Sequence, residues 1–164
     1  MDMSSLLLLA VFEVASFAAA APGVIFRPGA WYQQLDKPRW RPPDWLFAPV
    51  WTVLYASIGL SGWLVLIEEG IAGAALPLGV YAVQLLLNAA WTPIFFGLHR
   101  PGLAMVEIIL LWAAIFATII VFYPVNAVAA LLLAPYLAWV SFAVALNMSI
   151  WRRNRSKPML QGAR

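Results

Sequence analysis

The sequence predicts an all-α integral membrane protein, built as a single domain and a bundle of five transmembrane helices. Hydrophobic residues make up 64% of the 164 positions and charged residues only 10%, against roughly a quarter in soluble domains. The apolar residues lie in runs of about twenty, the length that crosses a hydrocarbon layer of roughly 30 Å. All ten Lys and Arg residues lie in a few short segments between these runs or after the last of them.

The five apolar runs are expected to be helices, because backbone polar groups in lipid must be satisfied within the segment. They cover residues 5–25, 46–67, 76–98, 102–123 and 126–151. Pro135 lies inside the fifth run, where its missing backbone donor predicts a kink. The first run also resembles a cleavable secretion signal. Glu13 interrupts it and no Lys or Arg precedes it, so we expect the segment to be retained.

The basic residues set the expected orientation. Five spans place them all on one side of the membrane: Arg27, Lys37, Arg39, Arg41, Arg100, Arg152, Arg153, Arg155, Lys157 and Arg164. The positive-inside rule makes that side cytoplasmic, so the N-terminus lies outside and the basic tail of residues 152–164 inside. The net charge of +3 then reflects topology and contact with anionic lipid headgroups. No nucleic-acid recognition motif appears.

The connection after the first run, residues 27–45, reads RPGAWYQQLDKPRWRPPDW. One interpretation is an interfacial belt of aromatic rings at the level of the lipid headgroups. The other is a rigid cytoplasmic lid over the bundle, because four prolines fix the backbone and hold the large rings in place. We refer to this segment as the lid loop.

Polar and aromatic residues recur at helical spacing within three of the runs. The stripes are Gln84, Asn88 and Thr92; Tyr136, Trp139, Ala143 and Asn147; and Trp51, Tyr55 and Gly59. Such faces must look into the bundle, because unpaired polar groups are costly in lipid. Hydrogen bonding between helices is one explanation for Asn88 and Asn147. Convergence on a flat, largely apolar ligand cavity is the other.

At these residues the chain resembles the tryptophan-rich sensory protein / translocator protein family, also called peripheral-type benzodiazepine receptors. The resemblance rests on four blocks: Trp31-Tyr32-x-x-Leu35-x-Lys37-Pro38-x-Trp40-x-Pro42-Pro43, Pro49-Val50-Trp51-Thr52-x-Leu54-Tyr55, Gln84-Leu85-x-Leu87-Asn88-x-x-Trp91-x-Pro93-x-Phe95-Phe96-Gly97, and Pro135-Tyr136-Leu137-Ala138-Trp139-x-x-Phe142-Ala143-x-x-Leu146-Asn147. It extends from about Arg27 to Arg153. The first span and the tail carry no specific motif.

The resemblance implies a five-helix bundle, usually a homodimer, that binds porphyrins beneath the loop between its first two helices. Many members also bind sterols and isoquinoline-type ligands. By motif position, the ligand-binding residues are Trp31, Tyr32, Trp51, Asn88, Trp91, Trp139 and Ala143. Met148 stands where animal members carry the tyrosine of a sterol-recognition pattern, which argues against tight sterol binding. For the dimer contact we expect the helix-three surface formed by Gly79 and Val83.

The residues favour a metal-free, protoporphyrin-like tetrapyrrole over haem. The chain has no cysteine, and its one histidine, His99, lies at the membrane edge, so a standard axial ligand for iron is missing from the interior. Aromatic stacking would hold the ring system, and its propionates would pair with Lys37, Arg39 or Arg41. We expect no metal site, no obligatory cofactor and no dedicated catalytic residues.

The predicted function is therefore that of a membrane receptor or sensor for porphyrins and related apolar ligands, with a role in their transport or light-dependent degradation. One alternative is a proton-coupled small-molecule transporter that uses Glu13, a carboxylate inside the first span. A third hypothesis is an enzyme that oxidises bound porphyrin with light and oxygen. Glu107, about one turn inside the fourth run, is expected to have an interfacial or capping role.

Overall fold

The computed structural model describes residues 2–157, and every regular element in that range is helical. In chain order these elements are α1 (Met3–Ala18), α2 (Ala21–Ile25), α3 (Ala30–Gln34), the 3₁₀ turn η1 (Asp44–Leu46), α4 (Phe47–Gly73), α5 (Ala75–Thr92), the π-helical turn η2 (Pro93–Gly97), α6 (Pro101–Phe122), α7 (Ala127–Leu132) and α8 (Ala134–Asn154). Arg164, counted above with the basic tail, lies outside the described residues.

Within residues 2–157, four helical segments are long and apolar enough to cross a membrane: Asp44–Gly73, Ala75–Gly97, Pro101–Phe122 and Ala127–Asn154. They correspond to the second to fifth predicted spans. The first predicted span is the shorter apolar helix α1, followed by a turn and the five-residue helix α2. The all-helical membrane fold is thus confirmed, and the count of five spans stays a prediction.

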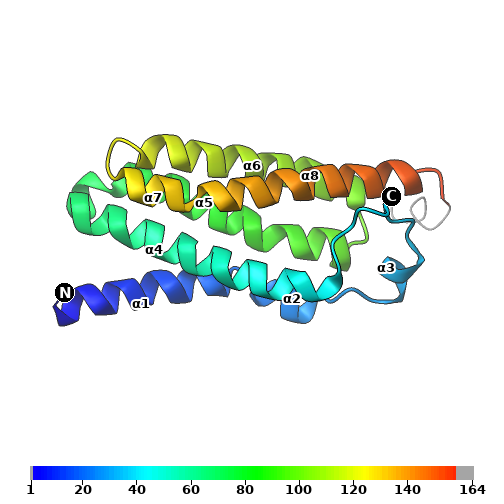
Figure 1. Ribbon diagram of the computed structural model, residues 1–164, viewed down its shortest axis with the longest axis horizontal. Helices are drawn as coiled ribbons and strands as arrows, with labels where there is room; N and C mark the ends of the chain where they lie inside the picture. Colours follow the sequence, from blue (N-terminus) through cyan, green and yellow to red (C-terminus); the bar gives the residue numbers. More distant parts are fainter. Residues whose placement is uncertain (1, 158–164) are drawn as a thin grey trace.

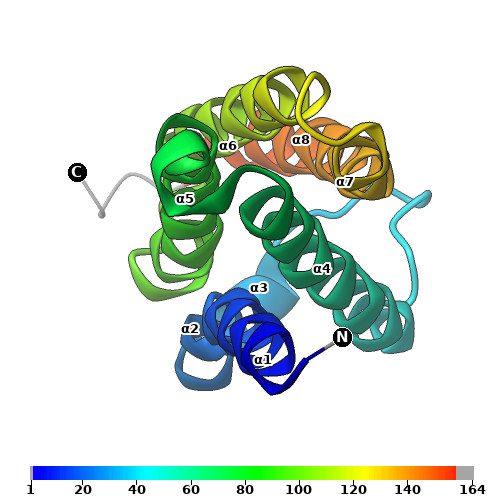
Figure 2. The same ribbon diagram turned by 90° about the vertical axis from the view of Figure 1, so that its left-hand side faces the viewer.

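The long helices run along a common axis, and α1 begins at the end of the bundle opposite to the end of α8 (Figure 1). The lid loop, the turn between η2 and α6, and the end of α8 share one end. Viewed along this axis, α1 and α2 lie on one side of α4, and α6, α7 and α8 on the other (Figure 2). Helix α4 contacts α1, α5, α7 and α8, so it is the central element of the bundle.

Two glycines of α4 let α1 approach closely. A Cβ atom at Gly59 would lie 2.7 Å from the Glu13 carboxyl carbon, and one at Gly62 would lie 2.7 Å from the Phe12 ring. In the same contact, the Ser16 hydroxyl donates to the backbone carbonyl of Tyr55 at 2.7 Å. Ser16 is completely buried, and this hydrogen bond satisfies its hydroxyl group.

Prolines and one glycine explain where the long helices bend. The predicted kink at Pro135 is confirmed, because the fifth span breaks at Leu133 into α7 and α8, with Pro135 in the first turn of α8. The second span continues past its predicted end at residue 67 to Gly73. Gly70 bends it there with a φ of 69°, a conformation that a residue without a Cβ atom adopts easily.

Candidate ligand-binding site

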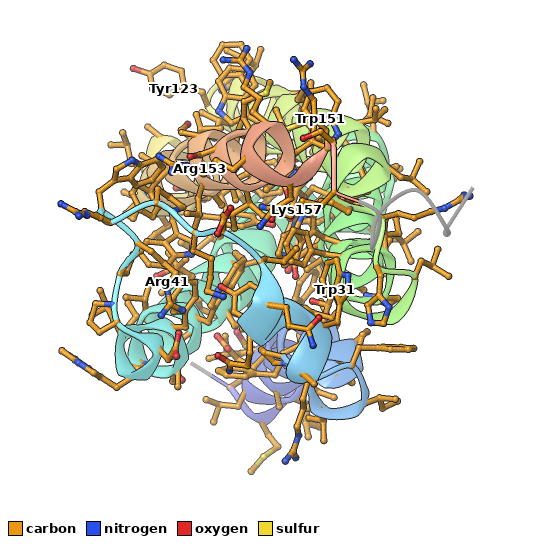
Figure 3. The ribbon with its side chains drawn as sticks, turned by 90° about the vertical axis from the view of Figure 1, so that its right-hand side faces the viewer. Trp31, Arg41, Tyr123, Trp151, Arg153 and Lys157 are labelled. Atoms are coloured by element: carbon orange, nitrogen blue, oxygen red, sulfur yellow. The ribbon has the colours of Figure 1, made fainter. Side chains whose placement is uncertain are left out.

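Five aromatic side chains pack together where the lid loop meets α5, and we call them the lid-end cluster. They are Trp31 and Tyr32 of α3, Trp91 of α5, and Phe95 and Phe96 of η2. The Trp91 ring stacks on Phe95 with centroids 4.9 Å apart, and Trp31 meets Phe95 edge-on at 5.7 Å. Tyr32 meets Phe96 edge-on at 5.3 Å. Figure 3 looks onto this end of the bundle and shows Trp31 beside α3.

The backbone of η2 positions the two phenylalanines. Pro93 has no N–H to donate to the preceding turn, and the Leu98 N–H donates to the Pro93 carbonyl at 2.9 Å, which closes a wider, π-helical turn. Phe95 is thereby only 1% exposed. Phe26, just after α2, packs against Gly97, where a Cβ atom would lie 2.7 Å from its ring. The residue that follows α2 is thus in direct contact with η2.

His99 adds an exposed ring to the lid-end cluster. It stacks on Trp31 with centroids 4.4 Å apart and an interplanar angle of 21°. Its φ of 55° is the one positive value of a non-glycine residue in the described range, and such conformations are held by their surroundings. We did not anticipate this contact, because a single histidine at the membrane edge carries no sequence signal for a stacking partner.

Two tyrosines deeper in the bundle connect Trp51 to Asn88. The Tyr55 hydroxyl donates to Asn88 Oδ1 at 2.8 Å, and Asn88 Nδ2 donates to the Tyr136 hydroxyl at 2.8 Å. Trp51 stacks on Tyr55 at 5.2 Å and meets Tyr136 edge-on at 6.1 Å. The predicted polar stripe on the third span faces inward, since Gln84 and Asn88 are both buried.

Trp139 and Ala143 lie on the face of α8 that looks toward α4 and the lid loop. Trp139 contacts Phe47 of α4 edge-on at 5.7 Å and Phe142 at 5.8 Å. Phe142 in turn contacts Trp40 of the lid loop at 5.6 Å. Trp51, Trp91, Trp139 and Ala143 pack, half-buried, against one core cluster. The predicted residues thus form an aromatic region below the lid loop that consists of two packed groups. Trp31 and Tyr32 belong to one, Trp51, Trp139 and Ala143 to the other, and Trp91 to both.

The lid loop is fastened to the end of α8. The Asp36 N–H donates to Asn154 Oδ1 at 3.0 Å, and Asn154 Nδ2 donates back to the Asp36 carbonyl at 3.0 Å. Asn154 is completely buried. Lys157 pairs with the Asp36 carboxylate at 2.7 Å, and its hydrogen bond and charge lower the pKa of that carboxyl. Sequence reasoning missed this pairing, because the two segments lie 118 residues apart.

The three cations expected to meet propionates have different surroundings. The Lys37 ammonium donates to the carbonyls of Tyr32, Gln33 and Leu35 at 2.6, 3.3 and 3.1 Å, which caps the open end of α3. Arg41 pairs with Asp44. Arg39 is exposed and has no hydrogen bond or ion pair with any described residue, so it is the cation with most freedom to meet an anion.

The two intramembrane acids, Glu13 and Glu107, have surroundings of a different kind. Glu13 packs on Gly59 between α1 and α4. Glu107 is 6% exposed, and neither of its carboxyl oxygens has a hydrogen-bond partner among the described residues. The capping role expected for Glu107 is therefore wrong. Helix α6 begins at Pro101, which leaves Glu107 in the second turn, beyond the positions that bond to free N–H groups.

Two grooves lie on α8, away from the predicted residues. One, of about 490 Å³, is lined by Ala145, Met148, Ser149, Arg152 and Arg153. The other, of about 260 Å³, lies between α6 and α8 and is lined by Ile109, Trp112, Ser141 and Val144. Below the lid loop the predicted tryptophans pack on neighbouring aromatic rings and stay half-buried: Trp51 on Tyr55, Trp91 on Phe95 and Trp139 on Phe47.

Comparison with known proteins identifies the family of the chain. The model of the TspO/MBR family matches residues 5–152. Protein CrtK of Rhodobacter capsulatus is 47% identical over 92% of this chain and 94% of its own length. The human translocator protein is 47% identical over 76% of this chain and 75% of its own. A tryptophan-rich sensory protein of Cereibacter sphaeroides is 38% identical over 92% and 94%. The aromatic region below the lid loop thus lies in a chain that belongs to the TspO/MBR family of integral membrane proteins.

Proposed function

We propose that this protein is a five-span membrane receptor that binds a metal-free porphyrin, or a related flat apolar ligand, below the lid loop. Its N-terminus lies outside the cell and its lid loop in the cytoplasm. The orientation rests on the basic residues. Those that the structure describes all lie in segments at one end of the bundle (Figure 1). Transport or light-dependent breakdown of the bound porphyrin follows as a further role of the same site.

The observation that carries the proposal is a pair of buried indole groups. The Nε1 atoms of Trp31 and Trp91 are buried and have no hydrogen-bond acceptor among the described residues. An unpaired buried donor costs about 1–3 kcal/mol, so an acceptor brought by a ligand would be favoured there. A porphyrin propionate supplies such oxygens, and the rings of the lid-end cluster supply stacking surfaces. Arg39 follows Trp31 and Tyr32 closely in the chain. It is exposed and has no partner among the described residues, so it could pair with a propionate.

Entry of the ligand requires the lid loop to move. Trp31, Tyr32 and Trp40 of the loop pack directly against Phe95, Phe96 and Phe142. A planar molecule can insert only when these pairs separate. The contacts between Asp36 and the end of α8 then decide how readily the loop opens. The family membership supports a receptor role, since relatives carry the names sensory protein and translocator protein.

The test is a protoporphyrin titration followed by quenching of tryptophan fluorescence. Trp51→Ala and Trp139→Ala remove rings of the proposed site and should weaken binding about five- to a hundredfold, from a loss of roughly 1–3 kcal/mol, as for the loss of a ring on which a flat base stacks. Trp112→Ala is the matched control, because Trp112 lies on α6 against Ser141. Unchanged affinity in both site variants would place the ligand outside the bundle. Purification in the dark and subsequent illumination would show whether a tetrapyrrole co-purifies and whether light consumes it.

A further inference from the structure

We propose that Asn88 is a positioning residue: it fixes the Trp51 ring through Tyr55 and Tyr136 and does not itself contact the ligand. The inference deepens the proposed function, since it rests on Trp51 being part of the ligand site. It changes the role that the family resemblance gives to Asn88. The evidence is the set of contacts that join α4, α5 and α8 at this level of the bundle.

The amide of Asn88 is engaged on both sides. Its oxygen accepts from the Tyr55 hydroxyl and its nitrogen donates to the Tyr136 hydroxyl, each at 2.8 Å. Both are buried hydrogen bonds between side chains of different helices. In an apolar interior such bonds fix the direction of each phenol ring, because a rotated ring would leave a polar group unpaired.

Both tyrosine rings pack on Trp51. Tyr55 lies against it with centroids 5.2 Å apart and an interplanar angle of 28°, and Tyr136 meets it edge-on at 6.1 Å and 67°. The indole is therefore held from two directions by rings that are themselves held by one amide. Loss of the amide would release both supports together.

Burial separates the positioning group from the surface that a ligand can reach. Asn88, Tyr55 and Tyr136 are 6%, 7% and 0% exposed, whereas Trp51 is only half-buried. Trp51 is thus the member of the group with the most accessible surface. A second anchor acts on Tyr55, whose backbone carbonyl accepts from Ser16 of α1 at 2.7 Å. That anchor holds the backbone and leaves the ring direction to Asn88.

The first measurement reads Trp51 directly and needs no ligand. The full chain is labelled with 5-fluorotryptophan, and the Trp51 signal is assigned in the ¹⁹F spectrum from the Trp51→Phe protein. Asn88→Ala, Tyr55→Phe and Tyr136→Phe should each shift or broaden the Trp51 signal and leave that of Trp112 unchanged. The two Tyr→Phe proteins keep their rings, so they test the idea even if Asn88→Ala folds poorly. An unmoved Trp51 signal in these variants would overturn the proposal.

The second measurement is a double-mutant cycle on protoporphyrin affinity. If Asn88 acts only through Trp51, the Asn88→Ala, Trp51→Ala double variant should bind as Trp51→Ala alone does, within about twofold. Tyr55→Phe and Tyr136→Phe should each weaken binding about fivefold, the equivalent of one ordinary hydrogen bond. Additive losses, or full affinity in the Tyr→Phe proteins, would show direct contact between Asn88 and the ligand and overturn the proposal.

The two measurements separate failure of this inference from failure of the proposed function. If Trp51→Ala binds protoporphyrin normally, the ligand site at Trp51 is refuted, and with it the role of Asn88 in binding. If Trp51→Ala loses affinity while the Trp51 ¹⁹F signal is insensitive to Asn88→Ala, the site stands and the positioning role is refuted.

Discussion

Buried amide side chains join segments that are distant in the chain. Asn88 links α5 to α4 and α8, Asn147 reaches the Pro101 carbonyl at the start of α6 at 3.2 Å, and Asn154 holds Asp36 of the lid loop. A short amide suits this role, because it offers donors and an acceptor on a side chain with little conformational freedom. One buried residue of α8 therefore supplies both backbone hydrogen bonds to Asp36 of the lid loop.

Replacement of Asn154 should loosen the lid loop. Asn154→Ala removes both hydrogen bonds to the Asp36 backbone, so we expect a loss of about 1–3 kcal/mol, from two bonds of about 0.5–1.5 kcal/mol each. Hydrogen–deuterium exchange of residues 35–41 should rise, with the bundle helices unchanged. Exchange equal to that of the native protein would mean that the loop is held by its aromatic contacts alone.

Lys157→Ala is the matched control at the same contact, and it should have a smaller effect that weakens in high salt, because the ion pair is solvent-exposed. The pKa of Asp36 is lowered by Lys157, so the pair stabilises the loop above the ordinary pKa of aspartate and is lost as the pH falls through the lowered value. The difference in melting temperature between the native protein and Lys157→Ala should vanish in the same acidic range.

At the scale of whole elements, the contact between α1 and α4 is built from glycines facing bulky side chains. Gly59 receives Glu13 and Gly62 receives Phe12. This arrangement gives Glu13 a packing role, and it bears on the alternative of a proton-coupled transporter that uses the same carboxylate.

Two substitutions test that contact. Glu13→Gln keeps the size and hydrogen-bonding capacity of the side chain but cannot ionise, so porphyrin affinity and stability should be unchanged. Gly59→Ala should destabilise the fold by about 1–3 kcal/mol, because the new methyl group meets the Glu13 carboxyl. Thermal unfolding in detergent measures both. Loss of pH-dependent uptake in vesicles by Glu13→Gln, with ligand binding intact, would favour the transporter instead.

The long elements were predictable because their signal is local. Runs of apolar residues and the break at Pro135 depend on neighbours in the chain, and the second to fifth spans begin and end close to the expected residues. The form of the break after Ala18 and of the π-helical turn at Pro93 was not predicted. A proline lies at each place and marks where a regular helix can be interrupted, but not which turn replaces it.

The candidate site was predictable as a set of residues and not as a set of contacts. Helical spacing and the family blocks pointed to Trp51, Asn88 and Trp139. The structure joins the first two through Tyr55 and Tyr136, and it places Trp139 against Phe47. The hydrogen bonds of Lys37 could not be predicted from the sequence, because its three carbonyl partners are brought together only by the end of α3. The ring contacts of Trp51 and Trp139 depend on side-chain rotamers, which a sequence does not specify.

For the molecule as a whole, the proposed topology has a direct test. The chain has no cysteine, so single cysteines report without background. Ser4→Cys and Ser156→Cys lie near opposite ends of the chain, and five spans require them to label from opposite faces of intact membranes. Labelling from the same face would exclude five spans and the cytoplasmic placement of the lid loop.

A second test at this scale concerns the homodimer. Gly79 and Val83 lie on α5, with Val83 exposed, and a Cβ atom at Gly79 would meet nothing within 4 Å in the single chain. Gly79→Leu should therefore leave the monomer stable and lower the dimer fraction in detergent, because close helix contact needs a small residue. Light scattering after chromatography measures that fraction, and Leu110→Ala on the exposed face of α6 is a suitable control. An unchanged dimer fraction would move the interface elsewhere.

The short first helix has a consequence for the surrounding lipid. The 16 residues of α1 span about 24 Å at 1.5 Å per residue, whereas the 27 residues of α4 beside it span about 40 Å. A hydrocarbon layer of roughly 30 Å matches neither length. Lipid next to α1 must thin, or draw α2 into the layer, while α4 must tilt or extend into the headgroups. In the proposed five-span topology the protein is therefore thinner at α1 than at α4. Acyl-chain length then becomes a variable that acts on the α1–α4 contact and, through Ser16 and Tyr55, on the proposed ligand site.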